Sequence, residues 1–511
     1  MTGEVSISPR GLMEGKYCPL IPVASRPRWR WLATIATWII LTSGGVAAQQ
    51  ANKDLIEEGR RLFMEETFEG NGRTCATCHP PSNNFTIDPA FIRTLKGNDP
   101  LFLTGPSLPE LRPIEVRRLL RNDALILENL DGFDQLGVLR GVPHTLGLSQ
   151  SLEPDEPLVD AGITHATGWS GDGSPGRRPH DPDGGSLKNF AKGAVIQHFT
   201  KSPDRVPGVD FRLPTEEELD ALKAFQLSLG RQEEINLDPV DPAALTFTDD
   251  FVEEGKVLFA GADSRNGNGR RCAGCHANAG ANNASGINRN FATGAMFAAN
   301  APACLRGFVA PYDGGFGVEP VEEVARADVC GTGPRGGPKA TSKFQGDLTM
   351  NTPSVIEAAD TPPLFHNNSA ETIEDAVAFY TSDVFNDSPA GNGNAFVLSG
   401  EQVNQIAALL RALNALENIR SSNAYDARAI DPMELAPATE LVALAIAEVT
   451  DAIEVLTEGP VELFAGTDAI QQLEQARELE RQALEQDPPN TVLLEEAILL
   501  KEGARDEMVG Q

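Results

Sequence analysis

One segment of this chain occurs twice, and each copy contains the pattern Cys-x-x-Cys-His. In the first copy, Glu57–Phe63 (EEGRRLF) leads into Cys75–His79 (CATCH). In the second copy, Glu253–Phe259 (EEGKVLF) leads into Cys272–His276 (CAGCH), and the two spacings differ by one residue. An internal repeat of this kind predicts two structural units of the same type. The fold must therefore accommodate the Cys-x-x-Cys-His pattern twice.

Cys-x-x-Cys-His is the attachment pattern of haem c, in which two thiols bind the vinyl groups and the adjacent His binds the iron. The alternatives are a zinc knuckle and a redox-active dithiol. Zinc needs four ligands at each site, and neither copy has a second close pair of Cys or His. A thioredoxin-like dithiol lies near a βαβ pattern, which the sequence does not show. The sequence therefore predicts two covalently bound haem c groups, one on Cys75, Cys78 and His79 and one on Cys272, Cys275 and His276.

We expect a mainly α-helical protein with two tandem cytochrome c-type haem domains, long loops and a C-terminal helical extension. Each copy closes with a stretch of helical period, at residues 215–225 and 401–413. The expected boundaries are 49–240 for the first domain, 241–430 for the second and 431–511 for the extension. Long Gly-, Pro- and Asn-rich loops separate the helices, and loops of such length are usually functional.

The N-terminal residues 1–48 differ in composition from the rest of the chain. Three arginines precede the apolar run 31–41, and the small residues 44–48 follow it. This order is typical of a secretory signal peptide, and we expect cleavage near Ala48. The alternative is an uncleaved membrane anchor, although the apolar run is short for a span of ~20 residues. Both interpretations predict that the remaining chain is exported to the periplasm.

The charge balance excludes one class of function. The chain has 42 Lys and Arg against 73 Asp and Glu, a formal net charge of −31. Sequence-independent nucleic-acid binding depends on Lys and Arg that neutralise phosphates, so a nucleic-acid partner is not expected. A basic or neutral partner suits this net charge better. Residues 431–511 hold 19 acidic and 4 basic residues, which predicts either a solvated helical hairpin or a surface that docks a partner.

Two such domains in tandem, with Thr352–Tyr380 in the second, resemble the bacterial di-haem cytochrome c peroxidases and their MauG relatives. The resemblance covers about residues 54–417. It implies an oxidoreductase whose first haem reacts with hydrogen peroxide and whose second haem relays electrons. It also implies that Tyr380 is the distal ligand of the second iron, with Met350 as the competing ligand. A tyrosinate ligand favours the ferric state and lowers the reduction potential.

The resemblance also describes a reaction pocket. It places Trp169 between the haems as an electron relay, whereas the simpler interpretation is a core or pocket Trp. Where peroxidases of this family have a Gln and, ten residues later, a Glu, this chain has Phe190 and Thr200. Cleavage of the O–O bond needs a positioned acid–base group, and Gln197 and His198 are the nearest substitutes. We expect His198, with an ordinary pKa near ~6.5, to be that group or a distal ligand of the first iron.

The remaining candidates are weaker. The resemblance implies a calcium ion held by oxygens of Thr361 and Pro363, but the family's Asn ligand is replaced by Gly147, which argues against it. Cys304 and Cys330 either pair after export or remain two buried thiols. His366 matches a family His near the second haem. Three further histidines lie in turn-rich stretches and are expected at the surface: His144, His165 and His180.

The sequence thus predicts an exported di-haem oxidoreductase that reduces hydrogen peroxide, with Trp169, His198 and Phe190 at the reaction site. One alternative is an oxygenase that uses dioxygen on an apolar substrate near Phe190. The other alternative is an electron-transfer cytochrome without enzymatic activity, whose acidic tail docks a partner. The sequence does not specify the electron donor or the organic substrate, and it is compatible with a homodimer.

Overall fold

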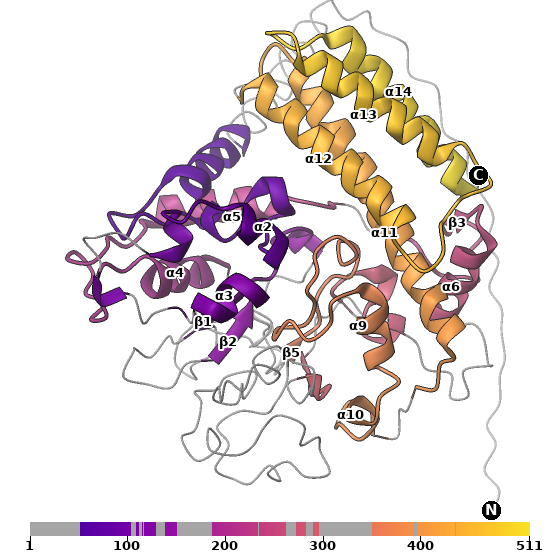
Figure 1. Cartoon of the computed structure of the whole chain (residues 1–511), viewed down its shortest axis with the longest axis horizontal. Helices are drawn as coiled ribbons and strands as arrows, with labels where there is room; N and C mark the ends of the chain where they lie inside the picture. Colours follow the sequence, from indigo (N-terminus) through magenta and orange to yellow (C-terminus); the bar gives the residue numbers. More distant parts are fainter. Residues whose placement is uncertain are drawn as a thin grey trace, which may run out of the picture. The chain divides into compact units, whose positions relative to one another are not determined.

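Helices make up most of the described part of the chain (Figure 1). The computed structural model describes residues 52–103, 109–111, 115, 117–128, 138–150, 187–232, 235–261, 272–282, 290–295, 350–392, 396–434 and 436–510. Its helices are 52–65, α2 (Pro89–Thr94), α3 (Arg117–Asp123), α4 (Leu187–His198), α5 (Glu216–Leu227), α6 (Asp250–Ala260), α9 (Ile373–Phe379), α10 (Asp383–Asn386), α11 (Gly400–Ile430), α12 (Ala438–Thr457), α13 (Ala469–Leu484) and α14 (Thr491–Met508). The predicted mainly α-helical class is confirmed, and both predicted closing helices form, as α5 and within α11.

The strands form three small antiparallel sheets. They pair β1 (Leu125–Glu128) with β2 (Val138–Gly141), β3 (Thr246–Phe247) with β6 (Val509–Gly510), and β4 (Asn290–Phe291) with β5 (Met350–Asn351). In the β1–β2 register, Ile126 lies opposite Arg140, so both side chains point to the same face. None of these sheets belongs to a βαβ unit, so the thioredoxin-like alternative finds no support within the described residues.

The repeat in the sequence corresponds to a repeated contact between helix backbones. In the first copy, a Cβ atom on Gly59 would lie 1.9 Å from the carbonyl oxygen of Ala221 in α5. In the second copy, a Cβ atom on Gly255 of α6 would lie 2.0 Å from the carbonyl oxygen of Gln405 in α11. Both glycines end the Glu-Glu-Gly triplet of the repeat. Only a residue without a side chain permits the first and last helices of each repeat to approach this closely.

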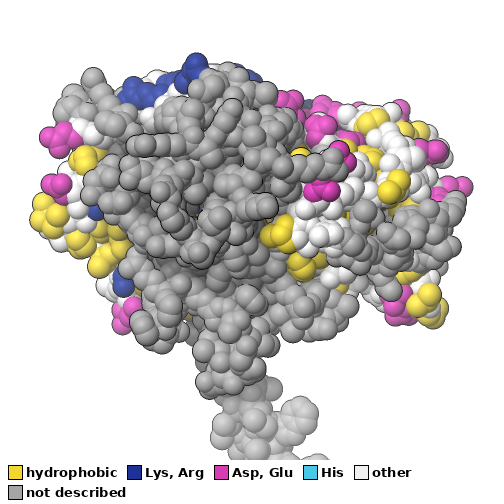
Figure 2. All heavy atoms as spheres, turned by 90° about the horizontal axis from the view of Figure 1, so that it is seen from below, with side chains coloured by type: hydrophobic (Ala, Val, Ile, Leu, Met, Phe, Trp, Pro, Cys, Tyr) yellow, Lys and Arg dark blue, Asp and Glu magenta, His cyan; other side chains and the backbone are white. Residues whose placement is uncertain are grey.

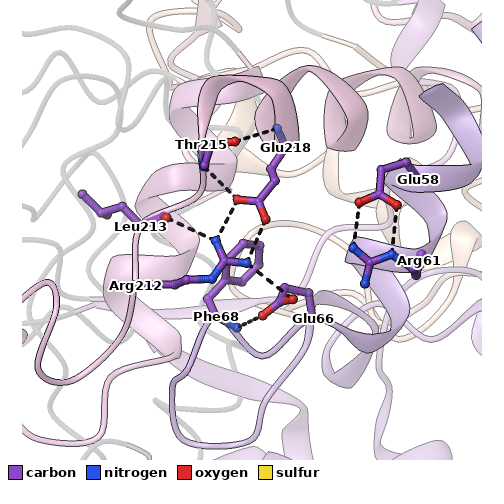
Figure 3. Close-up of polar contacts among 8 residues, drawn as sticks. All are labelled: Glu58, Arg61, Glu66, Phe68, Arg212, Leu213, Thr215 and Glu218. Carbon is purple, nitrogen blue, oxygen red and sulfur yellow. Dashed lines mark hydrogen bonds and ion pairs between the residues drawn. The ribbon is translucent and has the colours of Figure 1, made fainter.

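A polar network ties the first helix of the first repeat to α5 (Figure 3). The Arg212 guanidinium donates two hydrogen bonds of 2.8 Å to the Glu218 carboxylate and lies 3.4 Å from a Glu66 oxygen. It also lies 4.9 Å from the centre of the Phe68 ring. Thr215 caps α5 by accepting from the Glu218 N–H. Because the arginine is bidentate and shared, this network orients the loop that leads from the first helix toward Cys75.

The C-terminal extension packs on the second repeat. Its helix α12 lies along α11, and α13 and α14 lie beside them (Figure 1). Side chains of α12 such as Val449, Ala452 and Leu456 are fully buried in the same hydrophobic cluster as Ile406 and Leu409 of α11. The chain end returns to the second repeat through the pairing of β6 with β3. The extension is therefore three helices with buried apolar faces, so the interpretation as a solvated hairpin is wrong.

A buried charged cluster joins two helices of the extension to α11 of the second repeat. The ammonium group of Lys501 in α14 is fully buried and lies 2.6 Å from both Asp426 of α11 and Glu480 of α13. It also donates to the Ser422 hydroxyl at 2.7 Å. Removal of one charged member would leave the others uncompensated in the core. Such a loss typically lowers the free energy of unfolding by about 3–5 kcal/mol. The cluster therefore links three helices.

A second group of buried carboxyls lies where α12 meets the second repeat. Asp360 accepts hydrogen bonds of 2.8 and 2.9 Å from Asn414 and Asn418 of α11. Asn84, from the first repeat, donates to the Asp360 carbonyl at 3.2 Å and to the Asp451 carboxyl of α12 at 3.1 Å. Burial raises the pKa of Asp360 to about 6 and that of Asp451 to about 8. Glu448, also in α12, has its pKa raised well above the ordinary value by burial and by Asp451.

The chain divides into two units, residues 1–53 and residues 54–511. Only residues 52 and 53 of the first unit are described, so the predicted signal segment lies outside the described residues. No helix in the described ranges is long and apolar enough to cross a membrane.

The close backbone contact predicts an unusual response to alanine. Gly255→Ala should lower the free energy of unfolding by about 1–3 kcal/mol, because the new Cβ overlaps the Gln405 carbonyl. Helix propensity alone would change it in the opposite direction by about 1 kcal/mol. Gly400→Ala is the matched control, because a Cβ at this helix start meets nothing within 4 Å. Denaturant titrations measure both variants, and equal stability of the two would contradict the contact.

The buried carboxyls predict a pH dependence of stability. Folded Asp451 keeps its proton up to about pH 8, whereas the unfolded chain releases it near ~3.9. Stability therefore falls as the pH rises between these values, because the unfolded state binds fewer protons. Asp451→Asn keeps an oxygen for Asn84, and we expect it to raise the free energy of unfolding by on the order of 2 kcal/mol at pH 8 and little at pH 4. Equal gains at both pH values in thermal denaturation, or the same gain in exposed Glu462→Gln, would count against this explanation.

Candidate functional site

Both Cys-x-x-Cys-His segments line one cavity of about 850 Å³. The described part of the chain holds five histidines, and all of them line this cavity: His79, His144, His198, His276 and His366. Aromatic side chains form much of the remaining wall: Phe63, Phe190, Phe199, Phe259, Phe291, Phe365, Phe385 and Phe396. A large apolar cavity with a few convergent polar groups is typical of a ligand or cofactor site.

The first motif begins with a short 3-10 turn, Cys75–Thr77. The N–H of Thr74 donates to the Thr77 hydroxyl at 2.9 Å, and the His79 N–H donates to the Cys75 carbonyl at 2.9 Å. The ring Nδ1 of His79 lies 2.9 Å from the Phe85 carbonyl oxygen. A carbonyl can only accept, so Nδ1 carries the proton and Nε2 keeps the lone pair that a metal needs.

The second motif has the same geometry. It begins with the 3-10 turn Cys272–Gly274, and the His276 N–H donates to the Cys272 carbonyl at 2.9 Å. The ring Nδ1 of His276 lies 3.0 Å from the Pro353 carbonyl oxygen. Burial lowers the pKa of His276 to about 4 and also lowers that of His79. Both imidazoles are therefore neutral at neutral pH, as a metal-ligating His must be.

Burial keeps three of the four motif thiols protonated. Cys75, Cys78, Cys272 and Cys275 form no disulfide. Burial raises the pKa of Cys75 and Cys272 to about 12 and that of Cys78 to about 11. A reactive dithiol needs a lowered thiol pKa, so this environment argues against that alternative. Among the described residues, no three His, Cys, Asp or Glu side chains are gathered as ligands of one metal ion.

The donor set fits a covalently attached haem at each motif. Each motif presents two thiols on one turn, a neutral imidazole held by a backbone carbonyl, and an apolar cavity in front of them. The carbonyl partner of the second nitrogen is the usual means of fixing the ring orientation of a metal-ligating His.

Tyr380 caps the C-terminus of α9 and lines the cavity. Its ring packs at 4.9 Å from the Phe385 ring and 5.5 Å from the Phe379 ring, measured between centroids. Burial, together with the nearby Cys272 and Cys275, raises the pKa of the Tyr380 hydroxyl above its ordinary value. Met350 of β5 lines the same cavity, so both predicted candidates lie at the site.

Three of the predicted reaction-pocket residues lie on α4. Phe190, Gln197 and His198 line the cavity, whereas Thr200 is fully buried and donates its hydroxyl proton to the Ser202 carbonyl. Burial, assisted by nearby arginines, lowers the pKa of His198 to about 3. The expectation of an ordinary pKa is therefore wrong. At neutral pH this imidazole is neutral, and its surroundings disfavour protonation but leave a ring nitrogen that can bind a metal.

The structure reveals a similarity that the sequence analysis missed. In the second repeat, α9 and the four-residue α10 precede the closing helix, and Tyr380 is the C-cap of α9. In the first repeat, α4 precedes the closing helix, and His198 is the last residue of α4. Both residues line the cavity. His198 and Tyr380 thus each lie at the C-terminal end of a helix that contributes to the cavity wall.

Three further cavity residues were not recognised as such from the sequence. His144 was expected at the surface, which is wrong: it lines the cavity, its Nδ1 is buried, and burial lowers its pKa to about 4. Arg140 of β2 is 6% exposed and lines the cavity opposite Ile126. Arg73 also lines it and donates to the Leu101 carbonyl at 2.6 Å. Of these three residues, only Arg140 had a signal in the sequence: the alternation of side chains along β2 places it on the face that turns toward the cavity.

The residues predicted to bind calcium offer few free oxygens. Thr361 and Pro363 line the cavity, but the Thr361 hydroxyl donates to the Glu357 carbonyl at 2.7 Å. Gly147 brings no side-chain oxygen to replace the expected Asn. These residues do not make a convincing oxygen shell for Ca²⁺, which takes 6–8 ligands.

Several predicted residues lie outside the described residues. They are Trp169, His165, His180, Cys304 and Cys330.

Comparison with known proteins gives no further information on this site, because no protein-family model, curated protein or solved structure matches the chain.

Proposed function

We propose that this chain is an exported oxidoreductase of the di-haem cytochrome c peroxidase and MauG type, with a haem c at each Cys-x-x-Cys-His motif. One observation carries the proposal: two identical turns, each followed by a His whose Nδ1 is held by a carbonyl, line a single apolar cavity. The tandem cytochrome c domains and the periplasmic location belong to the same proposal.

Haem bound at these motifs would supply the iron that exchanges electrons with peroxide. The balanced reaction is H₂O₂ + 2 e⁻ + 2 H⁺ → 2 H₂O. In the proposal the second site relays electrons to the first, with Trp169 as the intervening group.

The chain's own residues perform the remaining tasks. Phe85 and Pro353 hold the two imidazoles through their carbonyls and thereby orient them. Phe190 excludes water from the side of the cavity that α4 lines. His198 lines the cavity and would take the proton of an incoming peroxide, as a weaker base than a free imidazole because burial lowers its pKa to about 3. Thr200 stands where the peroxidases have their Glu, so His198 is the proposed base in its place.

Two observations favour the alternative functions, an oxygenase and an electron carrier. Phe190 in the cavity wall, in place of a polar group, favours an oxygenase that binds an apolar substrate with dioxygen. The placement of His198 and Tyr380 at helix ends in the cavity wall favours an electron carrier, in which both side chains would bind haem iron.

The reaction with peroxide separates these functions. Mixing with hydrogen peroxide in a stopped-flow spectrometer should change the haem absorption of the wild type. His198→Ala should slow this change by about 10²-fold, because a positioned acid–base group typically contributes ~10²–10⁴-fold. Thr200→Ser is the matched control, since Thr200 is absent from the cavity wall.

Other outcomes contradict the peroxidase. A faster reaction in His198→Ala would identify His198 as a ligand that blocks the iron. Equal rates, together with consumption of dioxygen in the presence of an apolar substrate, would favour the oxygenase. No response of either variant to peroxide or dioxygen would leave the electron carrier.

The second site yields a separate prediction. Tyr380→Phe should change the low-spin EPR signal of the second haem to a high-spin signal and raise its reduction potential, because an anionic donor to Fe(III) is removed. Met350→Leu, at the same cavity, should leave both unchanged. The reverse pattern would assign the ligand to Met350.

A further inference from the structure

Shortly after Tyr380, the chain forms a very short helix, α10 (Asp383–Asn386). Ser382 caps this helix, because its hydroxyl accepts from the Phe385 N–H at 3.3 Å. Within α10, Phe385 is buried, whereas Asp383 is exposed. This helix lies at the lower edge of Figure 1, and Figure 2 views the molecule from that side, where apolar and acidic side chains lie together at the surface. The ring of Phe385 therefore turns inward from a short surface helix.

Three phenylalanines surround the ring of Tyr380: Phe365, Phe379 and Phe385, named here the aromatic cage. Their ring centres lie 6.4, 5.5 and 4.9 Å from that of Tyr380, in the same order. The Phe379 and Phe385 rings meet it edge to face, at 79° and 70°, which is an arrangement that aromatic pairs prefer. The Phe379 ring also lies 5.0 Å from that of Phe365 and 6.3 Å from that of Phe385, so the cage is continuous. The Tyr380 ring is therefore held in one orientation.

Residues that follow α10 fix Phe385 itself. The Asn386 side chain donates to the Phe396 carbonyl at 3.3 Å and accepts from the Phe396 N–H at 3.0 Å. The Phe396 ring lies 5.7 Å from the Phe385 ring, measured between centroids. A Cβ atom on Gly391 would lie 1.9 Å from the Phe385 carbonyl oxygen, so only a glycine lets the chain close on α10 here. Phe385 is therefore held between these residues and Tyr380.

The same helix contacts the segment next to the competing ligand, Met350. In the β4–β5 register, Met350 lies opposite Phe291. Just after β4, a Cβ atom on Gly294 would lie 2.9 Å from the Val384 carbonyl oxygen of α10. Thus α10 contacts the ring of Tyr380 and also the segment that leads out of the sheet carrying Met350. It is in a position to influence which of the two side chains serves the second motif.

We propose that α10, through Phe385, holds Tyr380 in place as the ligand at the second motif and so selects it over Met350. This inference rests on the proposed function. A ring that is already fixed loses little conformational freedom when its oxygen binds a metal, whereas Met has three rotatable side-chain bonds to immobilise. Phe385 has no metal-binding atom, so it is a positioning residue that acts through Tyr380.

Ordinary core packing is the simpler explanation of an aromatic cluster. It predicts that loss of a ring lowers the free energy of unfolding and leaves the ligand at the second motif unchanged. Positioning predicts a change of ligand as well. The EPR signal and the reduction potential of a haem depend on its axial ligand, so they separate the two explanations.

The test uses the full chain with haem bound at both motifs. Phe385→Leu removes the ring and keeps most of the apolar volume. We expect the fraction of the second haem without its Tyr380 ligand to rise by about two- to tenfold, which is the effect of losing one aromatic pair. EPR of the ferric protein measures this fraction, and potentiometric titration should show a higher reduction potential.

A second variant and a control accompany this one. Asn386→Ala keeps every ring of the aromatic cage and removes the two hydrogen bonds to Phe396, so it should change the EPR signal in the same direction. It decides the question where Phe385→Leu does not fold. Phe464→Leu is the matched control, because Phe464 is 2% exposed in the core and is absent from the cavity wall. The control should lose stability in thermal denaturation with an unchanged EPR signal.

Each outcome supports or overturns the proposal. A wild-type EPR signal in both α10 variants, together with a changed signal in Tyr380→Phe, overturns it, and so does an equal change in the control. A new low-spin signal in Phe385→Leu that Met350→Leu abolishes supports it, since Met350 then takes the vacated position. No effect of Tyr380→Phe itself contradicts the ligand in the proposed function and overturns this inference with it, so the two failures are distinguishable.

Discussion

In each repeat, a glycine allows the first helix to touch the backbone of the last helix. A Cβ atom at Gly59 or Gly255 would lie within about 2 Å of a carbonyl oxygen, so no other residue fits without moving a helix. This contact fixes the direction in which each first helix ends. Phe63 and Phe259, four residues further along these helices, therefore lie in the cavity wall beside the Cys-x-x-Cys-His turns. The site depends on this backbone contact more than on any single side-chain pair.

Burial keeps the imidazoles and motif thiols of the cavity neutral, and a group of buried carboxyls lies at a separate junction. Burial lowers the pKa of four histidines and raises that of three motif thiols, so these groups are uncharged: His79, His144, His198, His276, Cys75, Cys78 and Cys272. The carboxyls of Asp360, Glu448 and Asp451 are buried where the C-terminal extension meets the second repeat. An extension that contributes helices to the core and buried carboxyls to this junction is part of the folded unit, whatever else its acidic surface binds.

Local signals in the sequence predicted a large part of this arrangement. The repeat and the Cys-x-x-Cys-His spacing are local, and together with the helical period they identified the six motif residues and the closing helices in α5 and α11. The positions of Phe190, His198, Tyr380 and Met350 at the cavity agree with the resemblance, although their roles remain predictions.

The missed features depend on contacts between distant segments. His144 lies in a turn-rich stretch, and nothing nearby shows that the chain folds back so that this residue lines the cavity. The low pKa of His198 arises from burial and from Arg73 and Arg205, and Arg73 lies more than a hundred residues away. The burial of α12 follows from its packing on α11, whereas its acidic composition suggested a solvated surface. Periodicity identifies an apolar face but not the partner that covers it.

The central claim is that both motifs bind haem covalently, and intact-mass spectrometry of the denatured protein tests it most directly. Covalent links survive denaturation, so the account predicts a mass above that of the polypeptide by two haem groups. Cys75→Ala/Cys78→Ala and Cys272→Ala/Cys275→Ala should each retain one haem. A denatured wild-type protein with the mass of the polypeptide alone, after expression with a functional haem c maturation system, would contradict the account.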